Sequence, residues 1–128
     1  MLPSPGLVNK VLFRAFVRTN SSVEPVAIDT IISDGDVFQI AGGLRVIHAP
    51  GHCAGQVVFL WPQHGGVLLA ADTCSHVMGL GLSIGYEDLD QGRRTLQTLS
   101  RLSFDTACFG YGKFMAHGAI CKFQSKWG

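Results

Sequence analysis

The stretch "LRVIHAPGHCAGQVVFLW", residues 44–61, places a tight loop between two apolar runs. Residues 44–48 alternate in polarity, which predicts a strand with one wet face, whereas residues 56–61 are almost continuously apolar, which predicts a strand covered on both faces. His52 follows Pro50 and Gly51 in the loop between them. A histidine in that position is presented at the end of a strand, so His52 is the first candidate for a metal ligand.

The same pattern extends in both directions from this loop. Short runs rich in Val, Ile and Phe, separated by turns of Gly, Pro and Asp, predict successive strands from Val26 to Asp72. The expected strands are 26–32, 37–40, 44–48, 56–61 and 67–71. Because the runs 56–61 and 67–71 are the most apolar, we expect them to form the core of the sheet.

Helices are expected on either side of these strands. Asp88 is a candidate N-cap, since Gln91 lies three residues further on and a stripe of leucines follows. Residues 73–87 are glycine-rich and are expected to form an irregular loop. The remaining expected elements are an N-terminal helix within 6–18, a last short strand at 106–109 and a C-terminal helix within 115–127. The fold class is therefore α/β, layered, with a mixed, mostly antiparallel sheet and flanking helices.

Composition indicates one globular domain over residues 1–128. Of the 128 residues, 47% are hydrophobic and only 15% are charged, which is unlike a disordered chain. The formal charge of +1 provides no dense basic field, so we expect neither nucleic acid nor a membrane as a partner. No apolar run reaches the roughly 18 residues of a membrane span, and no signal peptide is recognisable, so a cytosolic location is the default.

Two further strand ends carry side chains that could join His52 in a site. Asp72 follows an apolar run, where a carboxylate is costly unless it is paired, hydrogen-bonded or coordinated; a turn or cap role is the alternative. Tyr111 lies between two glycines just after the run at 106–109. The tight loop at 50–55 is expected to require glycine at both Gly51 and Gly55.

The segment "LRVIHAPGHCAGQVVFLWPQHGGVLLAADTCSH" resembles the heart of the metallo-β-lactamase superfamily, which has a Pro-Gly-His-x-x-Gly turn and then a strand ending in Gly-Asp. The resemblance extends over residues 26–119 and leaves 1–25 unmatched. It implies a partial αββα sandwich with a site for two zinc ions at one edge. It further implies that His52 binds the first metal, that Asp72 bridges both metals, and that Tyr111 occupies the position of a histidine of the second.

Most of the ligands expected from this resemblance are missing. The His-x-His-x-Asp-His signature does not occur in the sequence, and the phenol of Tyr111 is a poor zinc ligand at neutral pH. Zinc needs about three or four protein ligands, so His52 and Asp72 do not suffice. Cys53, Cys74 and His76 could add a softer ligand set, and a second copy or a complementing chain could complete the site instead.

Two functional hypotheses follow. The first is a hydrolase-like protein of the metallo-β-lactamase fold that is catalytically impaired or inactive as an isolated chain. The second is a non-catalytic remnant or binding module that dimerises through an exposed sheet face, because part of a sandwich leaves apolar strands without their partner layer. The N-terminal helix is the local candidate for covering that face. The sequence selects no small-molecule substrate.

Overall fold

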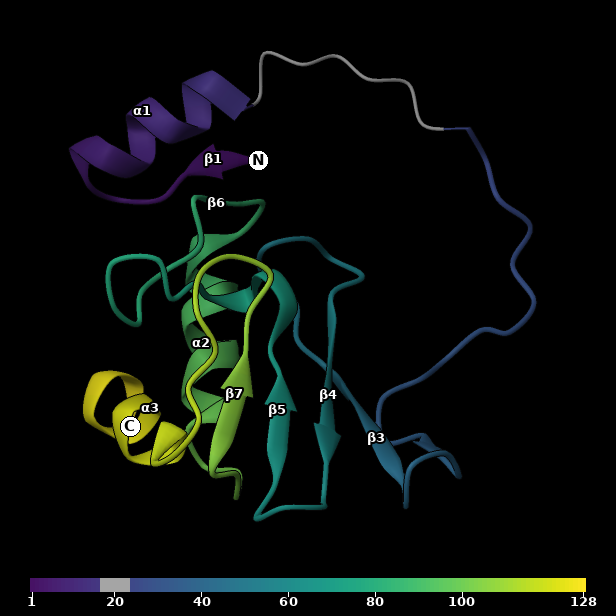
Figure 1. Cartoon of the computed structure of the whole chain (residues 1–128). Coiled ribbons are helices and arrows are strands. Elements are labelled where there is room, and N and C mark those ends of the chain that lie inside the picture. The colour runs from purple at the N-terminus through teal and green to yellow at the C-terminus, as the bar shows by residue number, and fades with distance from the viewer. Residues whose placement is uncertain (17–23) are drawn as a thin grey trace.

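A five-stranded mixed sheet forms the centre of the computed structural model, which describes residues 1–16 and 24–128 (Figure 1). The strand order is β2-β3-β4-β5-β7. All neighbours are antiparallel except β5 and β7, which run parallel. The strands are β2 (Val37–Phe38), β3 (Leu44–His48), β4 (Val57–Trp61), β5 (Val67–Leu69) and β7 (Thr106–Cys108). The expected fold class, a mixed sheet with flanking helices, is confirmed.

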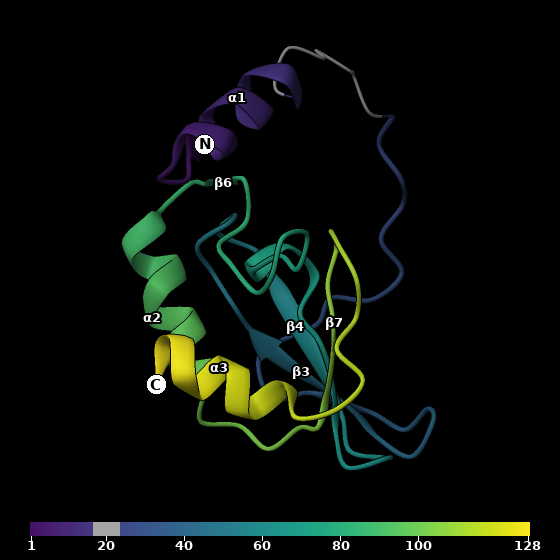
Figure 2. The same ribbon diagram turned by 60° about the vertical axis from the view of Figure 1, so that its left-hand side comes forward.

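One face of this sheet is covered by helix α2 (Leu89–Leu99) and helix α3 (Ala119–Trp127), which lie on the same side of it (Figure 2). Inward-facing strand residues such as Val58 and Leu68 pack with Leu96 of α2 and Phe123 of α3, and all four are fully buried. Among the described residues no helix covers the opposite face. The described part of the chain therefore forms one helical layer and one sheet layer, which is half of an αββα sandwich.

Helix α2 begins where the sequence predicts it. The carboxylate of Asp88 accepts a hydrogen bond from the backbone nitrogen of Gln91 at 2.8 Å, which satisfies one of the free amides of the first turn. Leu96 and Leu99 face the core, while Arg93 and Arg94 face solvent. Capping and the leucine stripe were sufficient to define this helix.

The strand expected at 26–32 is not formed, and that prediction was wrong. Residues 24–33 have no regular secondary structure, and Val26, Ile28 and Ile31 are 84%, 80% and 86% exposed. A β-like run becomes a strand only when a neighbouring strand accepts its hydrogen bonds, and here none lies alongside it. The expectation that β4 is covered on both faces was also wrong, because of its residues only Val58 is fully buried.

The strand expected at 67–71 ends early, at Leu69. The chain then turns through the short 3₁₀ helix η1 (Ala71–Thr73). Ala71 has φ +46°, a left-handed conformation that residues with a Cβ rarely adopt. This turn moves Asp72 out of the strand and onto the end of the sheet.

The N-terminal residues form a separate small unit beside the sheet. Strand β1 (Leu2–Pro3) pairs with β6 (Gly85–Tyr86), and helix α1 (Leu7–Phe16) follows β1. Figures 1 and 2 show α1 at one end of the molecule, beyond β6. The helix predicted from sequence is present, but it does not cover the open face of the sheet.

The start of α3 is held to β7 by one aspartate. Asp105 accepts hydrogen bonds from the Gly118 nitrogen at 2.7 Å and from the His117 Nδ1 at 2.9 Å. The Gly118 hydrogen bond, followed by the His117 contact, lowers the pKa of the Asp105 carboxyl below its ordinary value. Asp105 therefore anchors the loop that leads into α3.

We expect Asp105→Asn to reduce the acid sensitivity of folding. A carboxyl whose folded pKa is depressed stabilises the fold above its unfolded pKa, and this stabilisation is lost as the pH falls through the folded pKa. The variant should thus unfold more easily than wild type near neutral pH, and the difference should vanish in strong acid. Urea titrations at a series of pH values measure this. A constant difference at all pH values would contradict the assignment, and His117→Gln should have a smaller effect.

Within the described residues, no helix has both the length and the apolar character that crossing a bilayer would require.

Candidate functional site

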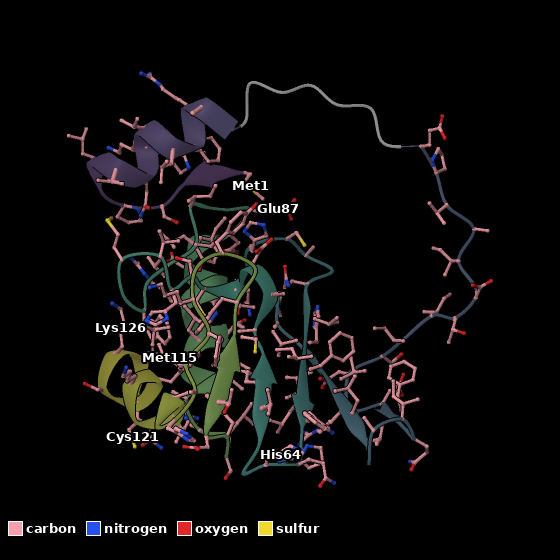
Figure 3. The ribbon with its side chains drawn as sticks, viewed as in Figure 1. Met1, His64, Glu87, Met115, Cys121 and Lys126 are labelled. Atoms are coloured by element: carbon pink, nitrogen blue, oxygen red, sulfur yellow. The ribbon has the colours of Figure 1, made fainter. Side chains whose placement is uncertain are left out.

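The loop after β3 is fixed by hydrogen bonds to the segment that precedes α2. The carbonyl of Gly51 accepts hydrogen bonds from the backbone nitrogens of Glu87 and Asp88, both at 3.0 Å. The Glu87 carboxylate accepts a further hydrogen bond from the Ala54 nitrogen at 2.9 Å. Glu87 marks this end of the sheet in Figure 3. The loop that carries His52 is therefore anchored to the start of α2.

Gly51 allows the loop to approach α2 closely. A Cβ on Gly51 would lie 2.3 Å from the Cα of Gly92, and its φ of +137° is accessible at low cost only to glycine. Gly55 has no positive φ, and a Cβ added there would have no neighbour within 4 Å. The prediction that the loop needs glycine at Gly55 was therefore wrong. At Gly51, both the positive φ and the close approach of Gly92 require glycine.

His52 has one ring nitrogen held by the backbone and the other directed at Asp72. Its Nδ1 lies 2.8 Å from the carbonyl oxygen of Gly85, and since a carbonyl only accepts, Nδ1 carries the hydrogen. The other ring nitrogen, Nε2, lies 3.9 Å from Oδ2 of Asp72. The ring also meets Tyr86 edge-on, with centroids 6.1 Å apart. His52 and Asp72 thus direct two possible metal-ligating atoms, Nε2 and Oδ2, toward the same place.

Asp72 is seated against the loop that follows β7. A Cβ on Gly110 would lie 2.0 Å from Oδ1 of Asp72, so only glycine leaves room for the carboxylate there. The Gly110 nitrogen also donates to the carbonyl of Ala71 at 2.8 Å. The side chain of Asp72 is 34% exposed and that of His52 is 16% exposed. The pair is therefore partly open to solvent.

Within the described residues, the four additional candidates do not join this pair in a larger ligand group. Cys74 is fully buried in the core, and burial raises the pKa of its thiol to about 12, which disfavours the thiolate that binds metal. Nδ1 of His76 donates to the Lys113 carbonyl at 2.7 Å. Cys53 is half-buried and its sulfur lies 3.9 Å from Oε1 of Gln56. Tyr111 is 46% exposed.

The other histidines are engaged elsewhere. His48 has its Nε2 at 2.9 Å from the carbonyl of Ala54, and the ring is again the donor. His117 is bound to Asp105. His64 lies in the hairpin between β4 and β5, and Figure 3 shows it at the end of the molecule away from Glu87. None of these three completes the pair formed by His52 and Asp72.

The described residues fit only part of a zinc site. In residues 1–16 and 24–128, no three His, Cys, Asp or Glu side chains are grouped so that they could hold a metal ion. Two ligands fall short of the roughly three or four that zinc requires from a protein. The orientation of His52 by the Gly85 carbonyl nevertheless has the form of the outer contact that positions metal-binding histidines.

Sequence reasoning missed the residues that hold this pair in place. Gly85 and Tyr86 orient His52, and Gly92 receives the loop; these positions are far from residue 52 in the chain. The hydroxyl of Tyr86 donates to the Thr73 carbonyl at 2.6 Å, and burial raises its pKa above the ordinary value. The glycine-rich segment at 73–87 was expected to form an irregular loop, and nothing local indicated which of its residues would contact His52.

Comparison with known sequences identifies two fungal relatives. The chain is 34% identical over 90 residues to the lactamase-like protein aptB of Emericella nidulans, a match that covers 70% of this chain and 26% of that protein. It is also 34% identical over 90 residues to the atrochrysone carboxyl ACP thioesterase AgnL7 of Paecilomyces divaricatus, covering 70% and 25%. The chain thus spans about a quarter of the length of these curated relatives. No protein-family model matches the sequence.

Solved structures show the same fold over more of the chain. A metallo-β-lactamase family protein from Thermus thermophilus matches with a TM-score of 0.64 and 24% identity, covering 93% of this chain and 43% of that one. An archaeal metallo-β-lactamase superfamily protein from Sulfolobus tokodaii matches with a TM-score of 0.66 and 13% identity, covering 94% and 48%. Over 90 residues the chain is thus similar in sequence to these two relatives, and over most of its length it has the fold of these metallo-β-lactamase superfamily structures.

Proposed function

We propose that this chain is a hydrolase-like protein of the metallo-β-lactamase fold that does not hydrolyse substrates as an isolated chain. The observation that carries the proposal is the pair formed by His52 and Asp72, with Nε2 and Oδ2 3.9 Å apart and no third ligand grouped with them in the described residues. The pair has the residue types and orientation of metal ligands, but two protein ligands are too few to hold a catalytic zinc ion.

The names of the relatives set the chemistry to be tested. One curated relative is named a thioesterase and the other a lactamase-like protein, so thioester and lactam cleavage are the relevant activities. Because the chain spans only about a quarter of these proteins, activity in this fold is expected to need ligands from outside the 128 residues. We propose a second copy or a complementing chain as one source of such ligands.

The test combines metal content with hydrolysis on protein purified without chelator. We expect elemental analysis to find far less than one zinc per chain, and thioester and lactam assays to give no turnover above buffer. His52→Ala should lower any residual zinc uptake, because it removes one of two ligands. His64→Ala is the matched control, since His64 lies at the other end of the sheet. Stoichiometric zinc that is lost in His52→Ala but kept in His64→Ala would overturn the proposal.

A second function, self-association through the open sheet face, is supported by a different observation. An apolar groove of about 240 Å³ lies on the face without helices. It is lined by Val57, Phe59, Leu69, Ala71, Cys108, Phe109 and Gly110. An uncharged groove on an open sheet is a surface that a second copy could bury, and its Ala71 and Gly110 flank Asp72. A dimer formed here would lie beside the candidate site.

Sedimentation velocity across a range of protein concentrations tests this association. We expect a concentration-dependent dimer that Leu69→Lys disrupts, because it places a charge in the groove. Thr98→Lys adds the same charge on the exposed side of α2 and should leave the dimer intact. A wild-type chain that stays monomeric at all concentrations would exclude the second function.

A further inference from the structure

Helix α1 turns its apolar side to solvent. Leu7, Val8, Val11 and Leu12 occupy one continuous side of the helix, and these residues are 79%, 52%, 60% and 37% exposed. The inward side instead carries Phe13, whose ring packs against the backbone of Gly85 in β6. An amphipathic helix ordinarily buries its apolar side, so this side of α1 lacks a partner in the chain as described.

Two cations border this apolar side. A groove of about 460 Å³ runs along α1 and is lined by Pro3, Leu7, Lys10, Val11, Phe13 and Arg14. Lys10 and Arg14 are four residues apart and therefore lie on the same side of the helix. The first sixteen residues contain no Asp or Glu to neutralise them. The groove thus combines an apolar floor with positive charge only.

A neighbouring loop extends the apolar surface. Val77 and Met78 are 64% and 82% exposed at the tip of the loop between η1 and β6. A second hollow of about 260 Å³ lies between this loop and α1, with Val8, Leu12 and Met78 among its walls and Lys126 of α3 at its margin. Two separate elements therefore present apolar side chains next to basic ones.

We propose that α1 and the loop tip at Val77 and Met78 form a docking surface for an anionic lipid bilayer. Apolar side chains flanked by Lys and Arg match a surface whose headgroups are negative and whose interior is apolar. A second copy is a poorer occupant, because a two-fold contact through this groove would bring Lys10 and Arg14 of both copies together.

The balanced charge of the whole chain concealed this arrangement. The formal charge of +1 led to the expectation that no membrane is involved. That sum, however, gives no information about where the charged residues lie. In the structure, the basic residues of α1 have no acidic neighbour on their own element, while their apolar neighbours are exposed. Binding at the membrane surface requires neither a spanning helix nor a high net charge.

Co-sedimentation with vesicles tests the proposal on the full chain. We expect binding to phosphatidylcholine vesicles that contain phosphatidylserine, and weak binding to phosphatidylcholine alone. Lys10→Gln with Arg14→Gln should lower the affinity for the anionic vesicles roughly 30-fold, at about 1 kcal/mol for each basic residue. Leu7→Ser with Val11→Ser should abolish binding to both kinds of vesicle, because it removes the two most exposed apolar side chains of α1.

The control variant replaces two basic residues by glutamine at positions away from α1. Arg101→Gln with Lys122→Gln removes two exposed cations and should leave vesicle binding unchanged. Circular dichroism should show that all variants retain the wild-type spectrum. The proposal is overturned if the wild-type chain does not bind anionic vesicles, or if the control variant loses as much affinity for them as the α1 variant. It is also overturned if the α1 variants instead convert a wild-type dimer into monomers.

Discussion

Gly51→Ala is expected to destabilise the fold by about 3 kcal/mol or more, the largest effect of any single change considered. The new Cβ would lie 2.3 Å from the Cα of Gly92, which is backbone and cannot rotate away. Alanine would also have to adopt φ +137°. The loop or α2 must move, and with it the hydrogen bonds from Glu87 and Asp88 to the Gly51 carbonyl.

Urea unfolding followed by circular dichroism measures this cost. The matched control is Gly55→Ala in the same loop, which has open space around it and no positive φ. We expect that variant to stay within about 0.5 kcal/mol of wild type, as is usual for surface changes away from special features. Equal destabilisation by both variants would show that the loop tolerates no alanine for a reason other than its contact with α2.

Tyr111→His is expected to raise zinc affinity roughly tenfold or more, because it adds an imidazole next to an oriented two-ligand pair. The backbone around Tyr111 is fixed by its neighbours. Gly110 packs against the Asp72 carboxylate, and the Tyr111 carbonyl accepts a hydrogen bond from the His76 nitrogen at 3.0 Å. A histidine in this position would have its Cα held close to the pair.

Isothermal titration with zinc compares this variant with two others. Tyr111→Phe removes the phenol without adding a ligand and should show no gain. Tyr111→His combined with His52→Ala should return to the affinity of wild type or below, because the new site would share His52. A gain that survives the loss of His52 would place the added zinc elsewhere, and no gain at all would mean that position 111 is too far from the pair.

The elements that sequence predicted well are those whose cause is local. The N-cap of α2 depends on Asp88 and Gln91, which are three residues apart. The strand at 44–48 forms with the expected bounds, but Val46 and Ile47 are both buried, so the predicted wet face was wrong. The segment 26–32 has similar local character but no neighbouring strand, so it stays extended and exposed. Local pattern therefore identifies candidate strands, whereas pairing determines which of them form.

The residues of the candidate site likewise fall into those that local sequence predicts and those that only the fold brings together. His52 and Asp72 could be named from the loop and the strand end that carry them, and the structure places them 3.9 Å apart. Their support comes from Gly85, Tyr86 and Gly110, which reach the pair from distant parts of the chain. Cys74 is likewise buried by packing in the core. Its position in the sequence, two residues from Asp72, does not reveal this burial.

The exposed segment at residues 24–33 also acts as a covalent tether. Strand β1 pairs with β6 through Leu2 with Tyr86 and Pro3 with Gly85, and the Ser4 nitrogen donates a hydrogen bond to the Ile84 carbonyl at 3.0 Å. A covalent connection favours a short pairing of this kind, because it keeps the two strands at a high effective concentration. A protease cut at an exposed bond such as that after Ala27 would make the pairing bimolecular. The N-terminal unit would then leave at low protein concentration and uncover the buried backbone of Gly85.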